Sequence, residues 1–464
     1  MATTVDPKTL DAPALVAELR ASFARGTTRP EAWRRSQLRA LADMLTREEA
    51  RIFEALEADL RRCPTETFVG EVGFALGDVK HTLRHLGRWM RPEKVSSPLV
   101  NFKGSSRIHY EPLGVVLIIG PWNYPIQLLL APLVAAIAAG NCAVVKPSEL
   151  APASSRLMAE LLPRYLDPAC IRLVEGGVSE TTALLEQRYD HVFFTGSTRV
   201  GKIVYQAAAR HLTPVTLELG GKSPCIVDRS VDLAVAARRI VWGKLFNAGQ
   251  TCVAPDYVLV HEAQREPLLA ALRQTVTDFY GADPRQSPDL PRIINQGHYE
   301  RLVSYLEQGE VVFGGEHDAA ERYVAPTVLA GPALDAPVMQ DEIFGPILPV
   351  LPVASVDEAI AFVNERPKPL ALYVFTERRE VARAVIDRTS SGGACVNDTL
   401  SHLVVPDLPF GGVGDSGIGA YHGRHGFETF SHARGVVDRS TRIDLPLRYP
   451  PYVNTLRWLR KFMG

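Results

Sequence analysis

The sequence predicts an α/β protein with two doubly wound α/β domains, because two stretches alternate apolar strands with amphipathic helices. The first stretch begins at Gly114 and continues through short apolar runs to Leu219. The second begins at Ser223 and includes the run L-A-L-Y-V-F at residues 370–375. Continuous apolar strands separated by helices are typical of parallel sheets that are covered on both faces. Such sheets bind ligands at the carboxyl ends of their strands.

The segment before Gly114 is expected to be mainly helical. Apolar residues recur at helical spacing within residues 38–60, and Pro30 suits the start of a helix. Residues 96–110 are polar and show no continuous helical or strand pattern, which favours an extended arm or hairpin; the alternative is a plain surface loop.

The elements of the two α/β stretches follow from their apolar runs and helical spacing. In the first stretch we expect strands at 114–119, 142–145, 171–174, 191–194 and 215–219, and helices at 125–139, 153–162 and 198–209. In the second we expect strands at 223–227, 257–260 and 370–375, and helices at 234–246, from 263, at 356–364 and at 378–388. A boundary between the two is placed near Gly220–Gly221, and short strands are expected after Phe427.

Composition and charge exclude several classes of protein. The chain of 464 residues has a formal net charge of -1, which gives no support for a nucleic-acid partner. Its 6 cysteines lack the paired spacing of a disulfide framework or a metal site. The first residues, M-A-T-T-V-D-P-K, do not resemble a signal peptide, and the apolar-rich stretch 126–139 is too short to span a bilayer. We therefore expect a soluble, cytoplasmic protein.

One cysteine, Cys252, lies in the segment F-N-A-G-Q-T-C-V-A-P at 246–255. This segment joins an expected helix to an expected strand, with Gly249 as a break in the backbone, and catalytic residues commonly lie on such bends. A free cysteine is also commonly buried and inert, so this alternative stays open. Cys142 and Cys225 lie in apolar strands and are expected to be core residues; Cys63, Cys170 and Cys395 have no polar cluster near them in the sequence.

Polar side chains follow two strands of the first stretch. Asn123, in G-P-W-N-Y-P, carries an amide donor suited to a developing oxyanion, or it fills a turn for its own backbone. Lys146 and Glu149, in V-K-P-S-E, could hold the two hydroxyls of a ribose, or they form a solvated ion pair.

Further candidates follow the next strands. Gly196 and Ser197, in T-G-S-T-R-V-G, precede a helix whose N-terminal amides could bind a pyrophosphate, or they only cap it. Glu218 lies in an apolar strand, where a raised pKa would suit a general base; the alternative is a structural ion pair. Glu342 and Phe344, in D-E-I-F-G-P, could contact a second ribose and a flat ring.

Taken together, these segments resemble the aldehyde dehydrogenase superfamily from about residue 20 to the end. The resemblance rests on P-W-N-Y-P, K-P-S-E, F-T-G-S, E-L-G-G-K, N-A-G-Q-T-C, E-I-F-G-P and P-F-G-G in this order. The segment Q-T-C-V-A-P-D-Y around Cys252 and the tail segment 421–432 resemble the class 3 branch. That resemblance implies oxidation of medium- or long-chain aliphatic or aromatic aldehydes with NAD or NADP, commonly by a homodimer.

The resemblance also implies roles for individual residues. Cys252 would be the nucleophile, Glu218 the general base and Asn123 an oxyanion donor. The implied cofactor contacts are Trp122, Lys146, Glu149, Gly196, Ser197, Val200, Gly201, Glu342 and Phe344.

The expected organisation combines both lines of reasoning. It has a Rossmann-like NAD(P)-binding domain (1–95 and 111–220), a catalytic domain (221–405), a small β bridging and oligomerisation region (96–110 and 427–450) and a tail (451–464). The basic, partly amphipathic tail is expected to pack on protein, with weak contact to a membrane surface as the alternative. His422 is expected to make a structural hydrogen bond rather than to face substrate.

Three other functions remain open at this point. A coenzyme A-acylating dehydrogenase would pass the acyl group to a thiol instead of water, which Glu218 argues against. A catalytically idle binding protein could use the same scaffold. Thiol-dependent esterase activity could accompany the main reaction.

Overall fold

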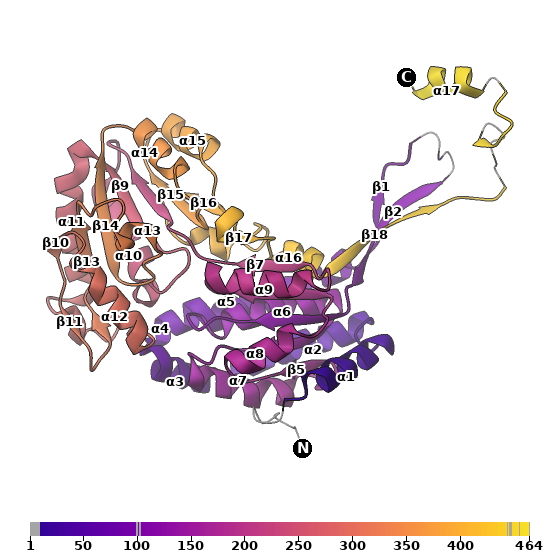
Figure 1. Ribbon diagram of the computed structural model, residues 1–464, viewed down its shortest axis with the longest axis horizontal. Coiled ribbons are helices and arrows are strands. Elements are labelled where there is room, and N and C mark those ends of the chain that lie inside the picture. Colours follow the sequence, from indigo (N-terminus) through magenta and orange to yellow (C-terminus); the bar gives the residue numbers. More distant parts are fainter. Residues whose placement is uncertain are drawn as a thin grey trace.

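The computed structural model describes residues 10–98, 101, 104–442, 444, 448–453 and 455–463, with only the backbone described for 461–463. Two α/β bodies lie side by side, and a long arm projects from the first of them (Figure 1). The class predicted from the sequence, α/β with two parallel-sheet bodies, is confirmed.

The N-terminal segment is helical, as expected. Its elements are α1 (Ala12–Ala24), α2 (Glu31–Arg47), α3 (Glu49–Leu60), α4 (Pro64–Thr67), the π-helical turn η2 (Phe68–Val72) and α5 (Gly73–Trp89). Pro30 is the N-cap of α2, where its missing N–H costs no helical hydrogen bond.

The first sheet has six strands in the order β17-β7-β6-β3-β4-β5, and only β17 is antiparallel to its neighbour. Its strands are β3 (Val115–Ile119), β4 (Cys142–Lys146), β5 (Ile171–Leu173), β6 (His191–Thr195), β7 (Val215–Glu218) and β17 (Gly417–Ile418). The intervening helices are α6 (Gln127–Ala139), α7 (Pro152–Tyr165), α8 (Val178–Leu185) and α9 (Thr198–Ala209). Every residue of β3, β4 and β6 is buried, so both faces of the sheet are covered.

The second sheet has seven strands in the order β10-β13-β14-β9-β8-β15-β16, with only β10 antiparallel. They are β8 (Pro224–Val227), β9 (Tyr257–His261), β10 (Glu310–Phe313), β13 (Thr327–Ala330), β14 (Ile347–Val353), β15 (Ala371–Phe375) and β16 (Gly393–Val396). Its helices are α10 (Leu233–Leu245), α11 (Arg265–Tyr280), α12 (Gln296–Tyr305), α13 (Pro337–Gln340), α14 (Val356–Asn364) and α15 (Arg379–Arg388).

Residues 281–355 of the second body form elements that the local sequence pattern does not predict. They contain α12, α13, β10, β13, β14 and the two-stranded β11 (His317–Asp318) and β12 (Tyr323–Val324). Strands β10 to β13 have 4 residues or fewer, and β14 contains Pro349 and Pro352, so alternation and length give little signal there.

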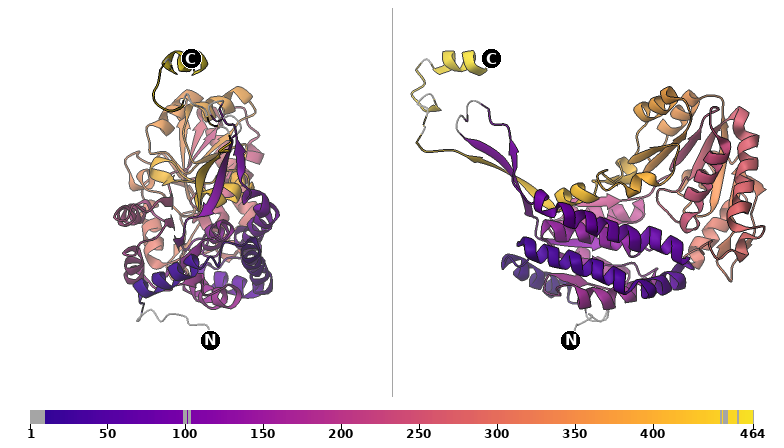
Figure 2. Two further views of the ribbon diagram at one scale, coloured as in Figure 1. Left: turned by 90° about the vertical axis from the view of Figure 1, so that its right-hand side faces the viewer. Right: turned by 180° about the vertical axis from the view of Figure 1, so that it is seen from behind.

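The arm is a three-stranded antiparallel sheet of β1 (Glu93–Val95), β2 (Ser105–Pro112) and β18 (Ser431–Asp438), which Figure 2 shows extending away from the body. The expected hairpin is therefore present, although its strands begin at Glu93 and end at Pro112. The expectation of several short strands after Phe427 is wrong for the described residues, because one strand of 8 residues pairs with β2 along its whole length.

Beyond the arm, the described tail ends in α17 (Thr455–Met463), which the right-hand view of Figure 2 shows at the outer end of the arm, away from both bodies. Its Leu456 and Leu459 side chains are exposed. Among the helices that are described, none combines the length and the apolar character that crossing a membrane requires.

Candidate active site

The polar segments singled out in the first stretch meet at one edge of the six-stranded sheet. Ile119 is in register with Lys146, and the Gly120 N–H donates to the Lys146 carbonyl at 3.0 Å. The Gly196 N–H donates to the carbonyl of Glu218 at 3.0 Å. The chain then crosses to the second sheet between Glu218, the end of β7, and Pro224, the start of β8. The carboxyl edge of the first sheet therefore adjoins the second body.

The bend that carries Cys252 begins earlier than the sequence indicated. Asn247, Ala248 and Gly249 all have left-handed φ angles, of 57°, 52° and 76°. A Cβ at Gly249 would overlap the carbonyl of Gly345, so this position requires glycine for space as well as for conformation. Three successive left-handed residues are strained, and such strain persists only where the surroundings enforce it.

Buried hydrogen bonds enforce this bend. The Gln250 amide donates to the carbonyls of Asn247 and Arg292, both at 3.1 Å, and its Oε1 accepts from the Ile294 N–H at 3.0 Å. The Thr251 hydroxyl shares a hydrogen bond of 2.6 Å with Tyr124. These contacts hold the residues just before Cys252, which is itself half-buried.

The Asn123 side chain is directed at the same bend. Its Nδ2 donates to the Gln250 carbonyl at 3.0 Å, two residues before Cys252, and its own carbonyl accepts from Asn247 Nδ2 at 3.0 Å. The alternative that Asn123 only caps its own turn is therefore not what the structure contains. Because a carboxamide has two N–H groups, one remains after the bond to Gln250.

Two carboxyl groups lie within electrostatic reach of the Cys252 thiol. Burial raises the pKa of Cys252, and Glu342 and Glu218 raise it further. Burial also raises the pKa of Glu218 well above its ordinary value, and it raises the pKa of Glu342 to about 8. Neither carboxyl oxygen of Glu218 has a hydrogen-bond partner among the described residues, so the alternative of a structural ion pair is wrong. The raised pKa values favour a protonated thiol beside protonated carboxyl groups in the resting site.

The residues proposed to contact a ribose form an ion pair. Lys146 Nζ lies 2.9 Å from Glu149 Oε2; the lysine side chain is 2% exposed and the glutamate side chain is 45% exposed. The alternative of a fully solvated pair is therefore wrong for Lys146. The carboxylate end of the pair is therefore more open to a ligand than the ammonium end.

The segment before α9 has the geometry of a capped helix start. Ser197 Oγ accepts from the Val200 N–H at 3.4 Å. A Cβ at Gly196 would overlap the Phe194 ring, and one at Gly201 would overlap Leu219, so both glycines allow close backbone approach. Ser197 can therefore cap α9 while the backbone beside Gly196 remains free to bind a ligand, so the two interpretations of this segment are compatible.

Glu342, Phe344 and Trp122 come together from the two bodies. The Trp122 and Phe344 rings pack edge to face with centroids 5.3 Å apart, and Phe344 has a left-handed φ of 50°. A Cβ at Gly220 would overlap the Glu342 carboxylate, whose Oε1 is buried without a partner among the described residues. An unpaired carboxylate oxygen, a glycine-lined cradle and a buried lysine are groups that fit the riboses and phosphates of a dinucleotide.

The tail segment 421–432 supplies a wall that the sequence analysis did not assign. Tyr421 is buried and interacts electrostatically with both Glu218 and Cys252. His422 stacks on Phe410 at 5.2 Å and lies 5.6 Å from the Phe74 ring. The expected hydrogen bond of His422 is absent at Nε2, which has no partner among the described residues. The signal was in the sequence, because Tyr421 lies in the segment that carried the class 3 resemblance.

Cys395 corrects another expectation, because its Sγ lies 3.1 Å from His402 Nδ1, seven residues along the chain. Burial raises the pKa of the Cys395 thiol and lowers the pKa of His402 to about 4, so the pair is neutral and unsuited to nucleophilic attack.

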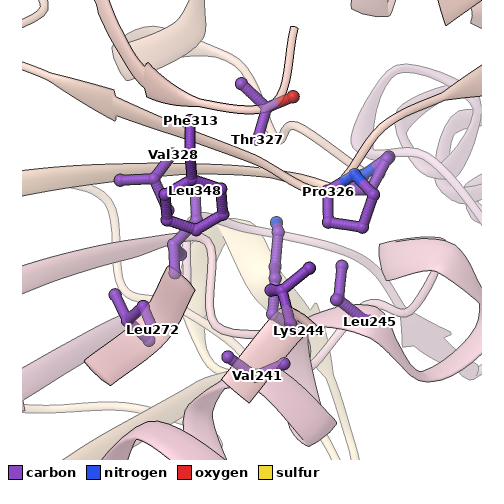
Figure 3. A pocket seen from close by; sticks show the side chains of 11 residues that line it. Val241, Lys244, Leu245, Leu272, Phe313, Pro326, Thr327, Val328 and Leu348 are labelled. Carbon is purple, nitrogen blue, oxygen red and sulfur yellow. The ribbon is translucent and has the colours of Figure 1, made fainter. Parts of the chain in front are cut away.

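A separate cavity lies behind α10, where Lys244 points between Pro326 and Phe313 (Figure 3). Apart from Lys244 and Thr327, the side chains that line it are apolar, and none of them is a proposed site residue. Burial lowers the pKa of Lys244 to about 8. We therefore assign this cavity to packing and not to substrate. No group of three or more metal-ligating side chains occurs in the part of the chain that is described.

Comparison with known proteins places these features in a family context. The model of the aldehyde dehydrogenase family matches residues 2–436. Aldehyde dehydrogenase family 3 member B1 of Rattus norvegicus is 52% identical over 439 residues, which cover 94% of each chain. Family 3 member A2 of Pongo abelii is 49% identical, covering 94% of this chain and 90% of that protein.

Solved structures agree with the sequence comparisons. The substrate-bound state of Staphylococcus aureus AldH superposes with a TM-score of 0.96 at 46% identity, covering 98% of this chain and 100% of that one. A Mycobacterium tuberculosis aldehyde dehydrogenase complexed with NAD+ superposes with a TM-score of 0.83 at 29% identity, covering 92% of this chain and 89% of that one.

Proposed function

Because the chain belongs to the aldehyde dehydrogenase family and is an NAD(P)-dependent aldehyde dehydrogenase, we propose that Cys252 attacks the aldehyde and Glu218 activates the water that releases the acid. The observation that carries this assignment is the pair itself. The half-buried Cys252 and a buried carboxyl without a partner among the described residues interact electrostatically at the junction of the two bodies.

The first half of the reaction requires a nucleophile because an aldehyde carbonyl cannot expel hydride, whereas a tetrahedral adduct can. The Cys252 thiol loses its proton to solvent, and the thiolate sulfur bonds to the carbonyl carbon while the C=O π electrons move to the oxygen. The free N–H of Asn123 and the Cys252 backbone N–H stabilise the oxyanion of this thiohemiacetal. NAD(P), when bound, supplies the hydride acceptor, and the adduct becomes a thioester on Cys252.

The second half of the reaction is hydrolysis of that thioester. Burial raises the pKa of Glu218, which matches this carboxylate to removing a proton from water near neutral pH. Water then attacks the acyl carbon, the bond to sulfur breaks, and the carboxylic acid leaves. Glu342 and Trp122 with Phe344 are proposed to hold the nicotinamide ribose and ring, and Lys146 with Glu149 the adenine ribose.

We further propose medium- or long-chain aliphatic or aromatic aldehydes as substrates. The support is the wall of Phe74, Phe410, Tyr421 and His422, whose rings contact one another beside the Cys252 and Glu218 pair. Burial lowers the pKa of His422 to about 3, so this wall carries no positive charge near neutral pH and favours apolar chains.

Product analysis tests the proposal against its nearest rival. With an apolar aldehyde and NAD or NADP, the expected product is the free carboxylic acid at a rate that added coenzyme A does not change. Formation of acyl-coenzyme A in place of acid would show that a thiol, not water activated by Glu218, takes the acyl group. Cofactor binding without any reduced cofactor across an aldehyde panel would favour an idle binding protein.

A homodimer through the arm is also proposed. The support is that β1, β2 and β18 form a thin sheet projecting from the body, with α17 and its exposed Leu456 and Leu459 held at its far side (Figure 1). Exposed apolar side chains of this kind are commonly buried against another protein surface. The same arm of a second copy of the chain would supply a surface of matching length. Membrane contact of the tail is the alternative.

Truncation after Pro451 is expected to weaken the dimer at least about tenfold, because each buried leucine contributes roughly 1.5–3 kcal/mol and 1.4 kcal/mol is tenfold in affinity. Light scattering across a dilution series measures this change. Equal dimer affinity, together with loss of binding to anionic vesicles on truncation, would assign α17 to a membrane surface instead.

A further inference from the structure

Arg62, just after α3, has a completely buried guanidinium that no motif in the sequence indicated. Its side chain is 0% exposed and forms an ion pair with Glu71, also 0% exposed, at 2.8 Å. The other donors reach the two loops of the site: Nη2 donates to the Asn123 carbonyl at 2.5 Å and Nε to Asn247 Oδ1 at 3.2 Å. One planar fork therefore contacts both the loop of Asn123 and the bend of Cys252.

Glu71 holds the other side of the Asn123 loop. While Oε1 accepts from Arg62, Oε2 accepts from the backbone N–H groups of Ile126 at 3.2 Å and Gln127 at 2.6 Å. These are the amides of the N-cap and of the first residue of α6, which otherwise lack helical partners. The ion pair thus fixes the loop at Asn123 and again three to four residues later.

The contacts of Arg62 converge on Asn123. Asn247, oriented by Arg62, donates from Nδ2 to the carbonyls of Asn123 at 3.0 Å and Gln250 at 3.1 Å. The guanidinium also lies over the Tyr124 ring, 4.7 Å from its centroid, and the Tyr124 hydroxyl bonds to Thr251. The Asn123 amide in turn donates to Gln250. Each link fixes the distance between the Asn123 amide and the residues just before Cys252.

A contribution to stability alone does not explain why the Arg62–Glu71 ion pair is buried here. Burying two charges costs several kcal/mol of desolvation, and apolar side chains of similar volume often stabilise a protein as well or better. A lysine could restore the charge but not the planar fork that serves three acceptors at once. We propose that Arg62 is a positioning residue that, braced by Glu71, sets the Asn123 amide at the oxyanion of the Cys252 adduct. This inference rests on the oxyanion role given to Asn123 above.

The test begins with Arg62→Lys in the full-length enzyme. We expect kcat for an apolar aldehyde to fall about 10- to 100-fold, because misplacement of a catalytic group by about 1 Å costs up to roughly 100-fold, while KM for the cofactor stays within about twofold. The single-turnover burst of reduced cofactor should slow by the same factor as kcat or more. Glu71→Gln is isosteric but keeps only one acceptor oxygen and places an NH2 donor at the other position. It should show a smaller loss in the same direction, and it replaces Arg62→Lys in the test if that variant does not fold.

Arg34→Lys is the matched control. Arg34 is likewise a buried arginine whose donors go to backbone carbonyls, those of Thr28 and Ala138, but it contacts neither loop of the site. This variant should lower thermal stability as much as Arg62→Lys and leave kcat within about twofold. An equal fall of kcat in both variants would show that loss of a buried arginine, and not misplacement of Asn123, is responsible, and would overturn the proposal.

A double-mutant cycle separates this inference from the function it rests on. If Arg62 acts through Asn123, adding Arg62→Lys to Asn123→Ala should lower kcat by less than about threefold more. A large loss in Asn123→Ala with a fully additive loss from Arg62→Lys would overturn the positioning role alone. A wild-type rate in Asn123→Ala would overturn the oxyanion role in the proposed function, and the inference with it.

Discussion

Replacing Cys252 with alanine is expected to abolish aldehyde oxidation, with kcat/KM lower by about 10⁴-fold or more, because no adduct that can expel hydride forms without the sulfur. Binding of NAD or NADP should be retained, since the proposed cofactor contacts lie on other segments of the chain. The measurements are reduced-cofactor formation under steady-state conditions and a fluorescence titration of the cofactor. A substantial residual rate would remove Cys252 from the mechanism.

The matched control is Cys395→Ser. Cys395 is buried beside His402, and both groups are neutral near pH 7, so this variant should keep kcat within a few-fold of wild type. The wild-type rate should also rise with pH, because the raised pKa of the Cys252 thiol leaves little thiolate at neutral pH. Alkylation of Cys252 by iodoacetamide, detected by mass spectrometry, should follow the same pH dependence, and the segment around residue 252 should stay unmodified in Cys252→Ala.

Replacing Glu218 with glutamine is expected to stop turnover after one hydride transfer. Deacylation should slow about 10²- to 10⁴-fold, the usual contribution of a general base, while a burst of about one reduced cofactor per active site remains. Rapid-mixing absorbance resolves the burst, and mass spectrometry of the quenched enzyme should find an acyl group on Cys252. Loss of the burst would assign Glu218 to deprotonation of the thiol instead.

The pH dependence gives Glu218 a second test. A carboxyl with a raised pKa gains its basic form as pH rises, so deacylation in the wild type should accelerate with pH through the neutral range. Glu218→Gln should lose this dependence. Glu342→Gln is the contrasting variant: Glu342 is proposed to hold the nicotinamide ribose, so its loss should slow the burst and spare deacylation. Identical kinetics in the two variants would contradict the separate roles.

The sequence predicted the strands of the first sheet well because each is a continuous apolar run followed by a helix with its own spacing. The runs at 114–119, 142–145 and 191–194 coincide with β3, β4 and β6 to within a residue or so at each end. The region of β10 to β14 gave no such signal. Its strands form by pairing with segments distant in the sequence, as β14 does with β9. Local periodicity does not reveal pairing between distant segments.

The sequence by itself determined the residue types of the site and their order along the chain, because polar side chains after apolar strands stand out locally. The tertiary structure decided which of them meet. It brought Tyr421 beside Glu218 and Cys252, left both Glu218 oxygens without partners, and inserted Arg62 between two loops more than 100 residues apart. Arg62 follows Arg61 in the sequence, and nothing in this local pattern indicates that Arg62 positions a site residue. Burial, pKa and hydrogen bonding depend on neighbours that only folding supplies.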